Sequence, residues 1–126
     1  MFKIDNNKNI YINRGDRMTV TLVNNSDRFL ANEDIIFSIC NIGDYTNVVF
    51  SKTFTVTEDC VELPLDFTTA EMRFTEPIKT GEKVFWYEVQ LVNRNNEEIT
   101  LIGHDIKGDK LFTVWPEVVA ADLGVE

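Results

Sequence analysis

The feature that most constrains the fold of this chain is an alternation of apolar and polar residues with a period of two. In the segment RMTVTLV, Met18, Val20 and Leu22 alternate with two threonines, which is the pattern of a β-strand buried on one face. A helix would bring its apolar residues back every three to four positions instead. Seven further segments are predicted as short strands: NIYI (9–12), DIIFSIC (34–40), VVFSKTFTV (48–56), CVELPL (60–65), VFWYEVQLV (84–92), EITLI (98–102) and KLFTVW (110–115).

Residues that favour turns separate these predicted strands. Asn95 and Asn96 suit a tight hairpin because asparagine tolerates positive φ, and Gly108 stands where another hairpin loop needs a left-handed residue. The segment DFTTAEMRF predicts one helical turn, with Thr68 or Thr69 as its N-cap. We therefore expect an all-β fold, an immunoglobulin-like antiparallel β-sandwich of about seven to eight strands with one short helical turn.

The tripeptide Arg14-Gly15-Asp16 matches a cell-adhesion signal, but its context predicts a turn. Strands are predicted on both sides, so NRGD connects the first two of them. Gly15 then takes a backbone conformation that other residues resist. Adhesion would need a projecting loop on an extracellular protein, and the sequence predicts neither a long loop here nor an export signal. We expect Gly15 to matter for stability and the Arg14 side chain to matter little.

Length and charge narrow the class of protein. With 126 residues, the chain has the size of one ordinary domain; residues 1–116 are the predicted sandwich and residues 117–126 a C-terminal tail. The net charge is −9, and no cluster of lysine and arginine is present that could bind phosphate groups, so neither nucleic acid nor an anionic membrane is an expected partner. The N-terminus lacks the apolar core of a signal peptide, which predicts synthesis in the cytoplasm without export.

Residue types that carry out catalysis or bind metals are sparse. Cys40 and Cys60 are far apart and have no zinc-ligand spacing around them, so we expect two free, packed thiols. His104 is the only histidine, which leaves few enzyme mechanisms open. Asp105 and Asp109 could contact calcium, but a lysine stands where a further oxygen ligand would be expected. The sequence therefore predicts a protein that is not an enzyme and has neither cofactor nor metal.

The order of the predicted strands carries a resemblance. The segments RGDRMTVTL, DIIFSI, VVFSKTFTV, FWYEVQL and DKLFTVWPE together resemble small immunoglobulin-like proteins encoded in the tail regions of phages and prophages of Gram-positive bacteria. These proteins are similar to the N-terminal domain of the phage baseplate upper protein family. The resemblance covers about residues 10–116 and implies a virion part that joins other tail or baseplate proteins.

This chain departs from that family in one respect. The family domain is usually followed by receptor-binding or connector segments, whereas this sequence stops at Glu126. A decoration or accessory protein of the virion is therefore the other expectation.

The candidate binding surface is the sheet face opposite the predicted core. Trp86 alternates there with Glu88 and Gln90, and apolar groups exposed together are typical of a protein contact. We expect contacts with other tail or baseplate proteins, or self-association into a homo-oligomer. Carbohydrate binding is the alternative, because an exposed tryptophan beside polar side chains can stack on a sugar ring. The candidate interaction residues are Trp86, Leu111, Trp115, Val118, Val119 and Leu123.

Overall fold

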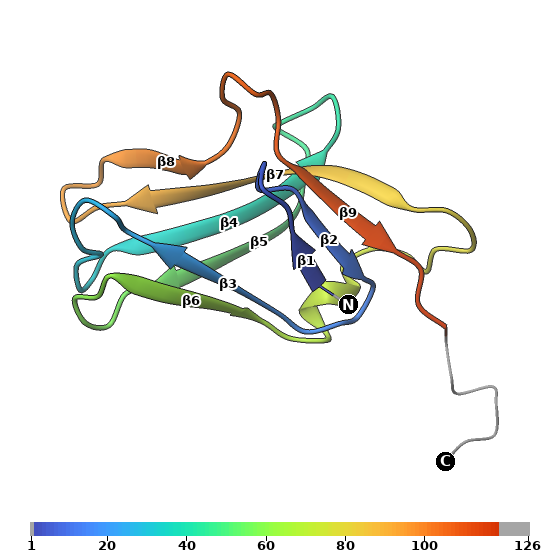
Figure 1. Cartoon of the computed structure of the whole chain (residues 1–126), viewed down its shortest axis with the longest axis horizontal. Helices are drawn as coiled ribbons and strands as arrows, with labels where there is room; N and C mark the ends of the chain where they lie inside the picture. Colours follow the sequence, from blue (N-terminus) through green and yellow to red (C-terminus); the bar gives the residue numbers. More distant parts are fainter. Residues whose placement is uncertain (1, 119–126) are drawn as a thin grey trace, which may run out of the picture.

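A computed structural model shows an all-β protein, and it describes residues 2–118 (Figure 1). All eight predicted segments form strands, so the alternation of period two is confirmed as the organising signal. The elements over the described residues are β1 (Phe2–Ile4), β2 (Ile10–Asn13), β3 (Met18–Val23), β4 (Asp34–Asn41), β5 (Val48–Thr55), β6 (Glu62–Phe67), the helical turn η1 (Glu71–Arg73), β7 (Lys83–Val92), β8 (Glu98–Ile102) and β9 (Leu111–Trp115).

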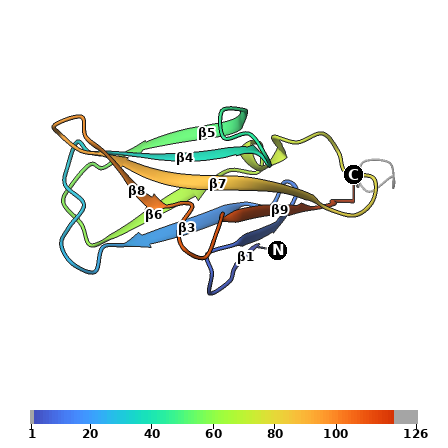
Figure 2. The same cartoon turned by 90° about the horizontal axis from the view of Figure 1, so that it is seen from above.

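The strands form a large and a small sheet that pack face to face. The large sheet has seven strands, in the order β1-β2-β9-β7-β4-β5 with β8 also on β7, and the small sheet consists of β3 and β6 (Figures 1 and 2). The second and fifth strands of an immunoglobulin sandwich pair in one sheet, and the third, sixth and seventh pair in the other. The pairs β3–β6 and β4–β7–β9 reproduce this arrangement, so the expected immunoglobulin-like sandwich is confirmed.

Two details differ from the sequence prediction. Strand β1 was not expected, because three residues are too few to show an alternation and a polar run, DNNKN, follows them. Strand β2 pairs with β9 in parallel, whereas every other strand pairing over the described residues is antiparallel. The parallel pair arises because the chain passes from β2 in the large sheet to β3 in the small sheet, so that β2 borders β9 rather than its neighbour in sequence.

The core lies between the sheets and is dominated by aromatic rings. Phe37 is fully buried, and its ring contacts Phe67 of the small sheet at a centroid distance of 4.8 Å. It also contacts Tyr87 at 5.3 Å and Phe112 at 6.2 Å. Each of these rings occupies an inward position of its strand, as the alternation predicts. Burial of such rings is the main favourable term that holds the two sheets together.

The predicted helical turn is present at η1, but its N-cap position is Ala70 and not Thr68 or Thr69, because the turn begins later than the sequence suggested. The hydroxyl of Thr68 accepts a hydrogen bond from the Glu71 amide at 3.1 Å, and the Glu71 carboxylate accepts one from the Thr68 amide at 2.8 Å. This reciprocal pair satisfies amide groups that a helix start leaves unpaired. With three residues in this element, no helix over residues 2–118 is long and apolar enough to cross a membrane.

One edge of β7 is shared by two strands in succession. Strand β9 pairs with the first part of β7, from Lys83 to Trp86, and β8 pairs with the last part, from Val89 to Val92. The loop 103–110 leaves the sheet between them and rises at the top of Figure 1. Asp105 and Gly108 pair across the tip of this loop, and Gly108 has the predicted positive φ, of 97°.

Candidate functional site

An apolar row crosses four strands on the outer face of the large sheet. Val48 of β5 is opposite Cys40 of β4, Cys40 is opposite Trp86 of β7, and Trp86 is opposite Leu111 of β9. Residues that are direct partners on adjacent strands project on the same side of a sheet. The structure therefore places two of the predicted interaction residues, Trp86 and Leu111, side by side. We call these four residues the apolar row.

Tyr45 lies on this row from the loop between β4 and β5. Its ring stacks on that of Trp86 with centroids 4.5 Å apart and planes 23° from parallel. The loop is held by Asp44, whose carboxylate accepts a hydrogen bond from the Thr46 amide at 2.9 Å. Asp44 also bonds the Thr46 hydroxyl. Tyr45 thus covers one ring face of Trp86, while the residue itself remains 49% exposed.

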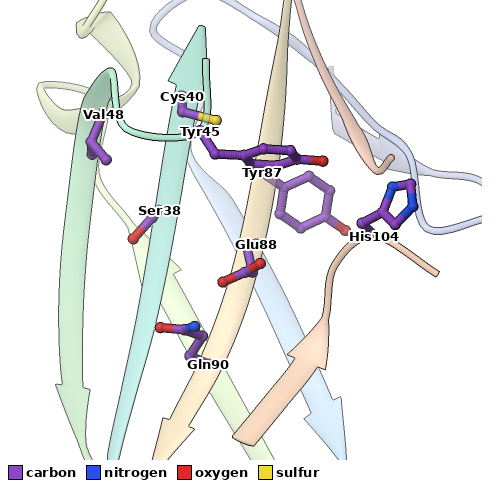
Figure 3. Close-up of a pocket in the computed structure, with 8 residues that line it drawn as sticks. All are labelled: Ser38, Cys40, Tyr45, Val48, Tyr87, Glu88, Gln90 and His104. Atoms are coloured by element: carbon purple, nitrogen blue, oxygen red, sulfur yellow. The ribbon is translucent and has the colours of Figure 1, made fainter. Parts of the chain in front are cut away.

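A pocket of about 490 Å³ lies beside this stack. Polar side chains approach it from the neighbouring positions of β4 and β7 and from the start of the loop 103–110 (Figure 3). Ligand-binding sites often combine an apolar surface with a few converging polar groups of this kind. The lining residues are Ser38, Cys40, Tyr45, Val48, Tyr87, Glu88, Gln90 and His104.

The polar groups of this pocket differ in whether they are already paired. The His104 ring places Nδ1 2.9 Å from Oδ1 of Asp109, and the Ser38 hydroxyl lies 3.3 Å from that of Ser51. By contrast, neither the Glu88 carboxylate nor the Gln90 amide has a side-chain hydrogen bond or ion pair to any residue between 2 and 118. The pocket therefore offers a free acceptor group and a free amide beside an aromatic ring.

Gly103 leaves room for the Glu88 side chain. A Cβ atom at position 103 would lie 3.2 Å from Oε2 of Glu88 and 2.8 Å from the side chain of Thr100. Side-chain carbon atoms rarely come so close to other heavy atoms. The absence of a side chain at Gly103 thus leaves the space that the carboxylate occupies.

Cys40 contributes an apolar surface to the pocket and not a nucleophile. Both cysteines are free, as predicted, and Cys40 is buried. Burial raises the pKa of its thiol, and the nearby carboxylates of Glu88, Asp44 and Asp109 raise that pKa further. Since the thiolate is the reactive form, this thiol stays protonated near neutral pH. Three carboxylates therefore lie near this thiol.

Trp115, the third predicted interaction residue, lies on the same sheet face but has a different set of contacts. Its ring stacks on Tyr11 with centroids 5.7 Å apart. The Tyr11 hydroxyl donates to Asp5 at 3.2 Å, and the Asn13 amide donates to the carbonyl of Pro116 at 3.2 Å. The Tyr11 hydroxyl and the Asn13 side-chain amide beside this second stack are thus paired within the chain. Trp115 fixes the end of β9 against β2.

The NRGD segment is a turn, as predicted. Gly15 has a φ of 86°, and the Asp16 amide donates to the carbonyl of Asn13 at 3.0 Å. The Gly15 amide donates to the carbonyl of Met72 at 3.0 Å, which attaches the turn to η1. Gly15 therefore has the left-handed backbone conformation that the sequence predicts.

The expectation that the Arg14 side chain matters little is wrong. This side chain is only 12% exposed. Its Nε donates to the carbonyl of Thr75 at 2.9 Å, and its Nη1 forms an ion pair with Glu117. Glu117 also accepts two bonds of 3.2 Å from Arg73. The sequence could not reveal this cluster, because its members are separated by as many as 103 positions.

The remaining predicted site residues divide between described and undescribed parts of the chain. Val118 is 83% exposed, whereas Val119 and Leu123 lie outside the described residues. Asp105, considered for calcium, accepts hydrogen bonds from Nζ of Lys110 at 2.9 Å and from the Lys107 amide at 2.8 Å. Two cationic or donor groups thus occupy an oxygen that a metal would need. Over residues 2–118, no group of three or more metal-ligating side chains gathers.

Tyr45 is the functional candidate that the sequence analysis missed. It stands in the segment IGDYTN, which has no alternation, so no face could be assigned to it. The only available signal was an aromatic residue inside a sequence typical of turns. A large apolar side chain in an exposed turn is often part of a binding surface.

A comparison of this chain with protein-family models, with curated proteins and with solved structures finds no match.

Proposed function

We propose that this protein is a non-catalytic interaction module of a phage or prophage virion, of the tail or baseplate type. The apolar row on the outer sheet face is the observation that supports it. Val48 in the row and Tyr45 above it are each about half exposed, at 51% and 49%. Trp86 and Leu111 extend the same surface across β7 and β9.

This surface is suited to contact with a protein. Its four positions adjoin one another in register, and three of them retain exposed area while Cys40 between them is buried. Exposed apolar area costs about 25 cal/mol per Å² in water, and burial against a partner would remove that cost. Aromatic residues near the centre of a contact usually contribute most of its affinity.

The assignment to a virion rests on the resemblance in the strand order described above. The resemblance implies that an immunoglobulin-like sandwich of this kind joins other components of the particle. The partner in this proposal is a neighbouring tail or baseplate protein or a second copy of the chain, and the working place of the protein is the virion.

The proposal is tested by substituting the apolar row. Trp86→Ser and Leu111→Ser should each abolish self-association, measured by light scattering, or co-purification with tail proteins encoded by adjacent genes. Val23→Ser is a matched control, because Val23 is 51% exposed but belongs to the small sheet. A wild-type protein that stays monomeric and binds no product of an adjacent gene would contradict the proposal. So would an assembly that tolerates both substitutions.

Carbohydrate binding is the second candidate function, with Tyr45 in place of Trp86 as the stacking residue. The face of Trp86 that could have stacked on a sugar is covered by Tyr45, so Tyr45 is the ring that a ligand would meet. Ser38, Glu88 and Gln90 beside it could bond hydroxyl groups. Binding of a panel of oligosaccharides that is lost in Tyr45→Leu would favour this function over the first.

A further inference from the structure

We propose that the pocket beside Tyr45 binds an arginine side chain of the partner protein, which stacks on the Tyr45 ring and pairs with the Glu88 carboxylate. This inference rests on the proposed function as a protein-interaction module and names the chemistry at the centre of the contact. Its support comes from the aromatic stack, the free carboxylate and the charge of the pocket.

The aromatic stack provides a rigid surface for a planar cation. Trp86 supports Tyr45 from below, with nearly parallel ring planes 4.5 Å apart between centroids. Tyr45 remains 49% exposed, and Figure 3 shows its ring extending over the pocket. A guanidinium group can stack on such a ring and is attracted by its negative face.

Glu88 supplies the anion at one side of this surface. It follows Trp86 by two positions on β7, so both side chains lie on the outer face of the sheet. No described residue forms a hydrogen bond or ion pair with its carboxylate, although twelve lysines and arginines are present in the chain. A carboxylate that is partly buried in a pocket and unpaired gains from a cation supplied by another molecule.

The charge around the pocket favours a cation over an anion. Asp44 and Asp109 lie close enough, with Glu88, to act on the Cys40 thiol. Among the described residues, no lysine or arginine lines the pocket, and the whole chain carries a net charge of −9. A basic group on the partner therefore complements this surface and also increases the rate of encounter.

Arginine fits this arrangement better than lysine. The guanidinium is planar, so it can lie parallel to the Tyr45 ring while two of its N–H groups bond one carboxylate. The Gln90 amide lies two positions beyond Glu88 on the same face, where its oxygen can accept a further N–H bond. Lysine offers a compact charge with neither the planar stacking nor the paired donors.

The direct test uses small probes on the intact protein. Nα-acetyl-arginine amide should shift the indole N–H resonance of Trp86 in a saturable way during an NMR titration, at millimolar concentrations. The citrulline analogue has the same shape without charge and should bind about fivefold more weakly or worse. The affinity of Nα-acetyl-lysine amide should lie between those of the arginine and citrulline probes.

Variants locate the site. Glu88→Gln should weaken the binding of the arginine probe about fivefold, to the level of the citrulline probe. Tyr45→Leu should weaken the binding of the arginine and citrulline probes, because both of them stack on the Tyr45 ring. Glu98→Gln is the matched control, because Glu98 is an exposed carboxylate at the far end of the same sheet face, and it should change nothing. Equal binding of arginine and citrulline, or wild-type affinity in Glu88→Gln, would overturn the inference. Saturable binding of methyl glycosides without any response to arginine would also overturn it and assign the pocket to a glycan.

The two proposals can fail separately. If Trp86→Ser abolishes assembly while the arginine probe has no effect on the protein, the interaction function stands and the arginine site is overturned. If the probe binds with the expected dependence on Glu88 but no variant of the apolar row affects any assembly, the arginine site is supported and the proposed function fails.

Discussion

Two tyrosine–tryptophan stacks lie on the same face of the same sheet, yet their surroundings differ. Around Tyr11 and Trp115, the neighbouring polar groups bond one another: Asp5 with the tyrosine, Asn13 with a backbone carbonyl, and Arg14 and Arg73 with Glu117. Around Tyr45 and Trp86, Glu88 and Gln90 remain without such partners among the described residues. The first stack is thus bordered by groups that bond within the chain, whereas the second lies beside a carboxylate and an amide available to another molecule.

This difference shows how identical ring chemistry can serve two purposes. Stacking alone does not distinguish a structural contact from a binding surface, because both pairs have nearly parallel rings. The distinction comes from the polar groups around them, since a buried polar group must be paired somewhere. We therefore assign the Trp115 stack to stability, and we propose the Trp86 stack as the one that binds.

The largest difference in stability between the two stacks is expected when each tryptophan is replaced by alanine. Trp115→Ala should lower the free energy of unfolding by about 3 kcal/mol, because it removes a half-buried ring that stacks on Tyr11 and joins β9 to β2. Trp86→Ala should cost only about 1 kcal/mol, because its covering residue lies in a half-exposed loop. Urea denaturation of both variants checks this, and equal losses would remove the distinction between the stacks.

A smaller effect is expected at the cluster that closes the Trp115 end. Glu117→Gln should lower the free energy of unfolding by about 2 kcal/mol at neutral pH, because it weakens charged hydrogen bonds to two arginines. Glu98→Gln, at an exposed carboxylate of β8, provides the control and should have little effect. If Glu117→Gln lowers the free energy of unfolding no more than Glu98→Gln does, the ion pairs of Glu117 with Arg14 and Arg73 contribute no more than an ordinary surface contact.

The effect of Glu117 should depend on pH with a definite sign. Hydrogen bonds from Arg73, and then from Arg14, lower the pKa of Glu117 below its ordinary value of 4.5. A carboxyl group with a lowered pKa contributes its full stability above the ordinary value and loses it as the pH falls through the lowered one. The difference in stability between wild type and Glu117→Gln should therefore be constant above about pH 4.5 and shrink below it, as thermal melts across this range can show.

The smallest effect on stability is expected at Tyr45. Tyr45→Ser should change the free energy of unfolding by less than about 0.5 kcal/mol, because much of the side chain is already in water. The same substitution should nevertheless impair assembly, since it uncovers Trp86 and removes the ring from the pocket. A melting temperature that falls as far as in Trp115→Ala would make the Tyr45 stack structural as well.

The fold could be predicted from the sequence because most of the strands carry their own alternation of apolar and polar residues. In β3, Met18, Val20 and Leu22 are buried while the residues between them are exposed, as the alternation predicts. The helical turn was also predictable, because Thr68 and Glu71 are only three positions apart. Strand β1 and the parallel pairing of β2 were not, since a three-residue strand has no measurable period and an alternation does not specify its partner.

The site could be predicted only in part. Alternation placed Trp86 and Leu111 on an outer face correctly, but it treated Trp115 as equivalent to Trp86. The difference depends on contacts over long sequence distances, such as Asn13 with Pro116 and Arg14 with Glu117. Tyr45 was missed for the same reason: its ring meets Trp86 only because β4 and β7 are adjacent in the sheet.

The division of one edge of β7 between β8 and β9 has a consequence for how this protein can diversify. Each of the two strands keeps its own register on β7, so the loop 103–110 can change in length or composition without shifting either of them. Ile106 at its tip is fully exposed, whereas His104 at its base lines the pocket. Insertions at the tip would therefore reshape the rim of the pocket while the sandwich stays intact, and related chains could acquire different binding preferences on an unchanged scaffold. The same tip offers a permissive position for displaying a foreign peptide.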